Sequence, residues 1–146
     1  MRLTALSVVG SAVASPDGVV HILRAGVSRI GLQAFPGAVQ AHLFVQLHSE
    51  LLPAGRSVEI NLAYEVSRVG QEKPLAEVHG VLVHVSPDDP IVDEEEAVLA
   101  LAMPLGFLAP AAGRYNVAFS LDGEQVGEVS FVVHGVDANL QPLRPE

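Results

Sequence analysis

The sequence contains no cysteine and no tryptophan, and Lys73 is its single lysine. The absence of cysteine excludes a disulfide framework, a thiolate nucleophile and a zinc ribbon. A phosphate-binding surface needs clustered lysine and arginine, whereas the seven arginines here are scattered through a chain with a formal net charge of −9. We therefore expect neither a nucleic acid nor an anionic membrane surface as a partner.

No stretch reaches the roughly 20 consecutive apolar residues that a membrane-spanning helix needs. Residues 1–14 begin with Met1-Arg2 and end with Ala12-Val13-Ala14, which resembles a short signal peptide with a small-residue cleavage site. Polar residues and a glycine interrupt the apolar part, and the turn sequence Ser15-Pro16-Asp17-Gly18 follows it. These features favour a first strand over a leader, and we expect a cytoplasmic protein.

Apolar residues make up 49% of the 146 residues, and aromatic residues only 5%. This is the composition of a globular chain, and the length fits one domain with a sizeable core. We place a single β-domain at residues 1–135. The remaining residues, 136–146, include Pro142 and Pro145 and are expected to form a loosely held tail.

Alternation of apolar and polar residues is the main structural signal along the chain. In residues 38–48, Val39, Leu43 and Val45 face one way and Gln40 and Gln46 the other, which is typical of a strand with one exposed face. Similar runs, separated by turn signals, predict an all-β fold, an immunoglobulin-like antiparallel β-sandwich of about eight strands. The expected strands are residues 3–13, 19–33, 38–48, 58–69, 75–85 and 97–103, followed by a hairpin within residues 113–135.

Three segments allow more specific predictions. The centre of residues 75–85, Val81-Leu82-Val83, is apolar on both faces, which is typical of a strand in the middle of a sheet. Residues 104–112 are rich in proline and glycine and are expected to form a crossover. Residues 93–101 carry three glutamates after Asp93, so a helix of about two turns is the alternative to a strand there.

The hairpin within residues 113–135 turns at Asp122-Gly123, a strong two-residue turn signal. A plain two-residue turn would place Glu128 and Ser130 on the apolar face, which burial does not tolerate. We therefore expect one extra residue, in a three-residue loop or a bulge near Gly127. The corrected pairing sets these residues opposite each other, with the aromatic rings facing the core: Leu121 and Gln125, Phe119 and Gly127, Val117 and Val129, Tyr115 and Phe131.

Four short turn and strand sequences occur together in this chain. They are Ala-Gly-Val-Ser-Arg-Ile-Gly at residues 25–31, Phe35-Pro36, Pro-Ala-Ala-Gly-Arg-Tyr at residues 110–115 and Leu-Asp-Gly-Glu at residues 121–124. This combination resembles a family of small bacterial β-sandwich proteins known only as a domain of unknown function. The resemblance covers most of the chain, but the family often carries an aromatic residue near Val27. It implies an immunoglobulin-like sandwich and supplies no activity, cofactor or catalytic residue.

Histidines are the first candidates for a metal site. His42 and His48 share one strand face but lie about 20 Å apart by strand rise, too far to bind one ion. His79 and His84 point to opposite faces of their strand. Only convergence from neighbouring strands, of His42 with His79 or His134, would bring ligands together. We therefore expect surface or strand-end histidines and assign no metal ligand.

Other sequence patterns for chemistry are weak. The acidic residues Asp88, Asp89 and 93–96 lack the regular spacing and the glycine of a calcium loop, so a solvated loop is favoured. Residues 26–31 have the wrong spacing for the Gly-x-Ser-x-Gly elbow of a serine hydrolase. A phosphate-cradling glycine loop is absent from the sequence. We assign no catalytic residue and no cofactor.

One strand face is a candidate for protein contacts. Gln40, His42, Phe44 and Gln46 share the polar face of residues 38–48, where we expect Phe44 to be exposed among uncharged side chains. Such a face can pack on another copy of the chain or on another protein. The sequence therefore predicts a non-catalytic structural or protein-interaction β-sandwich that self-associates. A module for a small ligand, a glycan or a metal ion is the alternative, and a metal-dependent enzyme is a second one.

Overall fold

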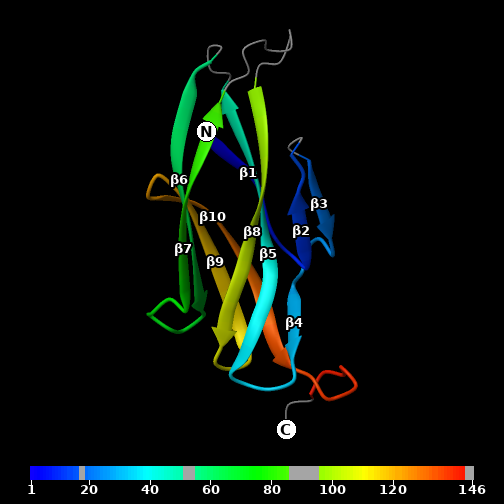
Figure 1. Cartoon of the computed structure of the whole chain (residues 1–146). Coiled ribbons are helices and arrows are strands. Elements are labelled where there is room, and N and C mark those ends of the chain that lie inside the picture. The colour runs from blue at the N-terminus through cyan, green and yellow to red at the C-terminus, as the bar shows by residue number, and fades with distance from the viewer. Residues whose placement is uncertain (17–18, 51–54, 86–95, 144–146) are drawn as a thin grey trace.

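The computed structural model describes residues 1–16, 19–50, 55–85 and 96–143. These residues form an all-β structure of ten strands without a helix (Figure 1). None of the described residues therefore belongs to a helix long and apolar enough to cross a membrane. The strands are β1 (Arg2–Val9), β2 (Ser11–Ala14), β3 (Val20–Leu23), β4 (Arg29–Leu32), β5 (Gly37–Glu50), β6 (Ser57–Arg68), β7 (Ala76–Val85), β8 (Glu96–Ala109), β9 (Gly113–Leu121) and β10 (Glu124–Gly135).

Two sheets face each other across one hydrophobic core. One has three strands in the order β1-β5-β8, and the other has five in the order β4-β10-β9-β6-β7. β4 and β10 run parallel, and the other described pairs in these sheets are antiparallel. β2 and β3 pair separately as a short hairpin that stands beside β5 and β8 (Figure 1).

The core consists of alternate residues from the long strands. On β5, for example, every second residue from Val39 to Leu47 is buried, as the alternation in the sequence requires. An aromatic cluster lies between the two sheets, where the rings of Phe107, Tyr115 and Phe131 have centroids 5.4 to 6.0 Å apart. Such pairs stabilise a fold by about 0.5–1.5 kcal/mol each beyond the area they bury.

The hydroxyl groups of two buried tyrosines donate hydrogen bonds to backbone carbonyl groups. Tyr115, at the start of β9, donates a hydrogen bond to the carbonyl of Ala111, 2.5 Å away. Tyr64 of β6 donates to the carbonyl of Pro104 in β8 and so connects the two sheets. Because a buried hydroxyl without a partner is costly, both bonds restrict how the strands pack.

The prediction of eight strands is too low because two of the expected strands are interrupted. Residues 3–13 split into β1 and β2 at Gly10, whose backbone lies close to the Arg24 side chain. Residues 19–33 split into β3 and β4, because Arg24 and Gly26 have φ angles of 58° and 69°. A left-handed backbone cannot continue a strand.

The predicted crossover at residues 104–112 is wrong for its first part. β8 continues through Pro104 to Ala109 and pairs with β5 along its whole length. Proline is tolerated here because β8 is an edge strand, so the missing N–H interrupts no ladder. The strand prediction for residues 97–101 is confirmed, whereas residues 93–95 lie outside the described residues.

The bulge predicted for the closing hairpin is confirmed. The register shifts between Gln125 and Gly127, and the pairs of Phe119 with Gly127, Val117 with Val129 and Tyr115 with Phe131 form as expected. The pairing of Leu121 with Gln125 is wrong, since Leu121 lies opposite Glu124. A two-residue turn fits because Asp122 and Gly123 both have positive φ, so the extra residue is taken up by the bulge.

The prediction that residues 75–85 form a central strand is also wrong. β7 is the last strand of the five-stranded sheet, and Val81 and Val83 are exposed. The segment after β10 folds back on the sheet: Val136 is buried and its N–H donates to the carbonyl of Leu32. The N–H of Leu143 donates to the carbonyl of Gly135.

The bond between Tyr64 and Pro104 yields a prediction about stability and pH. Burial raises the pKa of Tyr64 above 10.0, because desolvation disfavours the phenolate. The folded state therefore holds this proton more tightly than the unfolded state does. The contribution to stability is complete below a pH of about 10 and declines as the pH rises further.

Tyr64→Phe is expected to lower the free energy of unfolding by about 1–3 kcal/mol near neutral pH, since the Pro104 carbonyl loses its donor. Urea unfolding of both proteins at several pH values measures this. Above a pH of about 10 the wild type should lose stability faster than the variant. If the free energies of unfolding of the wild type and of Tyr64→Phe change with pH in parallel, from neutral to alkaline pH, this role for Tyr64 is ruled out.

Candidate functional site

β7 has a strand neighbour on one side only. It pairs with β6 from Ala76 opposite Val66 to Val85 opposite Ser57, and none of the described strands pairs with its other edge. Along this edge the backbone N–H and C=O groups that point away from β6 are open to another strand. Figure 1 shows β6 and β7 side by side along one flank of the molecule.

The outer face of β7 carries a row of apolar side chains. Its register with β6, whose even-numbered residues from Ile60 to Val66 are buried, directs the odd-numbered residues of β7 outward. Three consecutive outward residues, which we call the valine row, are exposed: Val81 by 62%, Val83 by 53% and Val85 by 59%. One exposed valine needs no explanation, but three in a row on an open edge are typical of an interaction site.

The inner side of β7 is also incompletely covered. A Cβ atom added to Gly80 would have no heavy atom within 4 Å, and Val78 is 37% exposed. On the outer face, a shallow groove of about 280 Å³ adjoins the valine row and includes Val81. It is lined by Asn61, Leu62, Ala63, His79, Gly80, Val81 and Gly123.

The other sheet edges of the described residues are protected. β2, β3 and β4 are each only four residues long. β8 contains Pro104 and is contacted by the β2–β3 hairpin. β1 lies against β10, where Leu3 and Leu6 occupy the space that a side chain at Gly127 would need. Short length, proline and coverage are the usual ways in which proteins prevent edge pairing, and β7 has none of them: its ten residues include no proline, lysine or arginine.

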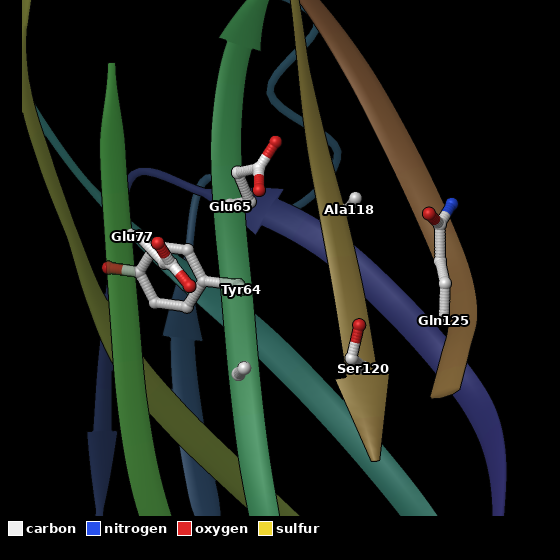
Figure 2. Close-up of a pocket in the computed structure, with 7 residues that line it drawn as sticks. Tyr64, Glu65, Glu77, Ala118, Ser120 and Gln125 are labelled. Carbon is white, nitrogen blue, oxygen red and sulfur yellow. The ribbon is translucent and has the colours of Figure 1, made fainter. Parts of the chain in front are cut away.

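The rest of the outer face of the five-stranded sheet is polar and acidic. A shallow hollow of about 140 Å³ crosses it, with small side chains such as Ala118 and Ser120 between Glu65, Glu77 and Gln125 (Figure 2). The Glu77 carboxylate lies 2.7 Å from the His79 ring, and both side chains are exposed. A carboxylic acid that acts in catalysis is usually buried, whereas Glu65 and Glu77 are exposed.

The face predicted for protein contacts lies on the other sheet. Gln40, His42, Phe44 and Gln46 share the outer face of β5, between β1 and β8. Gln40 is exposed, but Phe44 is half-buried rather than exposed, as are His42 and Gln46. The Nδ1 atom of His42 is buried and has no hydrogen-bond partner among the described residues. Because β5 is a central strand, this face offers no open backbone edge, and its role in binding stays a prediction.

The six histidines are spread over four strands. His21 is on β3, His42 and His48 on β5, His79 and His84 on β7, and His134 on β10, with β6 and β9 between β7 and β10. In the part of the chain that the structure describes, no three histidine, aspartate or glutamate side chains come together as metal ligands. The acidic residues 88–95 lie outside that part.

The sequence pattern indicates Val81 and Val83 of the valine row but not their position in the sheet. The run Val81-Leu82-Val83 is apolar on both faces, and such a run is typical of a strand whose two faces are both covered by other parts of the protein. In this structure Leu82 packs against the core on the inner face, whereas Val81 and Val83 are exposed on the outer face. Nothing in the chain's local pattern distinguishes these two situations.

If the valine row is not part of the core, its substitution should not destabilise the folded chain. We expect Val83→Thr to change the free energy of unfolding in dilute protein by less than about 0.5 kcal/mol. The matched control is Val66→Thr on β6, where a hydroxyl group in the core should cost about 1–3 kcal/mol. Denaturant titration of both variants measures the difference, and equal losses would show that Val83 belongs to the core.

Comparisons with known proteins do not place this chain in a family. No family model, no curated protein and no solved structure matches it. The resemblance to a family of small bacterial sandwich proteins therefore stays a prediction.

Proposed function

We propose that this protein is a non-catalytic interaction module that binds an extended strand of a protein chain along β7. The valine row on the open edge of β7 is the observation that carries the proposal. Strand addition to a sheet edge draws affinity from main-chain hydrogen bonds and specificity from alternate side chains. The edge of β7 offers both the open backbone groups and an apolar row for the side chains.

The side chains of β7 favour a particular kind of incoming strand. Val81, Val83 and Val85 are β-branched, and cross-strand pairs of β-branched or aromatic residues contribute about 0.2–1 kcal/mol each. On the inner side, the open space at Gly80 can accept a larger side chain. We therefore propose that the bound strand is itself rich in β-branched residues on one face.

We also propose that the fold is an immunoglobulin-like antiparallel sandwich. Two features support this assignment: a three-stranded sheet opposite a longer one, and Tyr115 at the start of β9. In immunoglobulin-like domains a tyrosine near the start of the corresponding strand bonds back to backbone a few residues upstream, as Tyr115 does to Ala111. Fold alone does not imply a function, so the interaction proposal depends on β7 itself. The cytoplasmic location stays a prediction.

A synthetic peptide with the sequence of residues 76–85 is a suitable probe for the edge. We expect the fluorescent peptide to bind the wild-type protein, because its backbone and valines match what β7 exposes. Two N-methylated versions, blocked at odd or at even residues, sharpen the test. Alternate N–H groups of a strand point to opposite edges, and a bound peptide uses the N–H groups of one edge only. The version whose methyl groups block that edge should therefore not bind, and the other version should bind.

Fluorescence anisotropy with two variants identifies the binding surface. Val83→Lys places a charge in the valine row and is expected to weaken peptide binding, since lysine protects edge strands from pairing. Gln40→Lys adds the same charge on the outer face of β5 and should leave binding unchanged. Equal binding to both variants, or binding of both N-methylated peptides, would contradict strand addition at β7.

A further inference from the structure

We propose that the strand bound by β7 is the β7 of a second copy of this chain, antiparallel to the first across a two-fold axis. The two five-stranded sheets then join into one continuous sheet. This inference rests on the proposed function of β7 as a strand-binding edge, and it names the partner.

Symmetry makes self-pairing of β7 geometrically simple. In a two-fold dimer the same surface serves both copies, so each contact occurs twice. A two-fold axis perpendicular to the sheet places β7 beside its own copy in the antiparallel direction. The same operation keeps the outer face of one sheet continuous with the outer face of the other. A single open strand therefore forms a closed dimer and leaves no long open edge among the described strands.

Charge favours edge pairing over stacking of the two outer faces. Each copy carries a formal net charge of −9. The outer face of the five-stranded sheet includes the exposed carboxylates of Glu59, Glu65 and Glu128, and face-to-face contact of two copies would bring these groups together. Pairing along β7 instead uses residues 79–85, which contain no carboxylate and no lysine or arginine.

The valine row argues against a strongly basic partner. Such a partner would be attracted to the glutamates, but its charged side chains would not form the β-branched cross-strand pairs that the valine row offers. An uncharged strand with valines on one face is the better match, and β7 is itself such a strand.

The valine row also selects a register. In an antiparallel pair that keeps inner and outer faces aligned, odd residues lie opposite odd residues. If the two-fold axis passes beside Val81, Glu77 of one copy lies opposite Val85 of the other. If it passes beside Val83, only residues 81–85 of the described strand are paired. An axis at Leu82 places Val81 opposite Val83 twice and leaves Glu77 outside the paired segment. We therefore infer the register centred on Leu82.

This register also fits the inner side of β7. With the axis at Leu82, Gly80 of each copy lies opposite His84 of the other, because the two numbers sum to twice 82. The space beside Gly80 is open, with no heavy atom within 4 Å of an added Cβ. Directly opposite residues have Cβ positions about 4.5–5.5 Å apart, so the imidazole of His84 can occupy that space.

Sedimentation equilibrium tests the dimer with the same two variants. We expect a wild-type dimer whose dissociation constant rises by at least about tenfold in Val83→Lys, because the two-fold axis introduces the charge twice. Gln40→Lys should leave the dissociation constant unchanged. A dimer that persists in Val83→Lys but is lost in Gln40→Lys would overturn both this inference and the strand-binding edge, and would place the contact on β5.

The absence of cysteine permits a direct test of register, since any introduced thiol is unique. Val81→Cys and Val83→Cys are mixed to allow exchange of copies and are then oxidised. The proposed register predicts that the mixed disulfide forms in excess over both symmetrical ones, since cross-strand Cβ atoms must lie within about 4.5 Å. Predominance of the disulfide between two copies of Val83→Cys would overturn this register.

The outcomes separate this inference from the proposed function. A wild-type protein that is monomeric at all concentrations, yet binds the peptide of residues 76–85, overturns the dimer and leaves the strand-binding edge intact. A monomer that also fails to bind the peptide overturns both. A dimer weakened by Val83→Lys, together with the mixed disulfide, supports both.

Discussion

The unpaired backbone at the edge of a β-sheet is the constraint on which this structure depends. Each sheet ends in strands with open N–H and C=O groups, and these groups pair with whatever strand reaches them. The fold protects β2, β3 and β4 by their shortness, β8 by proline and a covering hairpin, and β1 by packing against the facing sheet. β7 is treated differently, since it is ten residues long and carries valines where an edge strand usually carries charge.

The core explains why this edge can remain open without weakening the fold. The aromatic cluster and the buried residues of β5, β6, β8, β9 and β10 lie between the sheets, away from the outer side of β7. Tyr64 connects the sheets through the Pro104 carbonyl, and Tyr115 fixes the connection that leads into β9. β7 packs Leu82 against this core, but Val81, Val83 and Val85 on its outer face are exposed and lie outside the core. Their apolar character is therefore available for binding.

Local sequence patterns predicted the parts of the fold that depend on neighbours in the chain. The bulge near Gly127 followed from side-chain parity alone, because an apolar face and a turn sequence together determine a hairpin register. The interruptions at Gly10 and Arg24 could not be read in this way, since they depend on backbone angles and close contacts between separate segments. Pro104 was assigned to a crossover because sequence alone does not show that β8 lies at an edge.

The position of β7 at the edge of its sheet is another feature that local sequence patterns could not predict. The apolar run at Val81-Leu82-Val83 was visible in the sequence, but its place at the end of a sheet depends on the long-range pairing of β6 with β9. A pattern indicates how many faces of a strand should be buried and does not indicate what covers them. Here the pattern indicates two covered faces, and the described part of the chain covers only the inner one.

Residue-resolved amide hydrogen exchange of β7 tests this account most directly. About half of the β7 amides point toward β6, and the alternate ones point to the open edge. If the edge binds a strand of a second copy, the alternate amides should become protected as the protein concentration rises, and Val83→Lys should abolish that protection. Alternate amides that exchange as fast as those of an open edge at every concentration would contradict the claim that β7 pairs with a second copy.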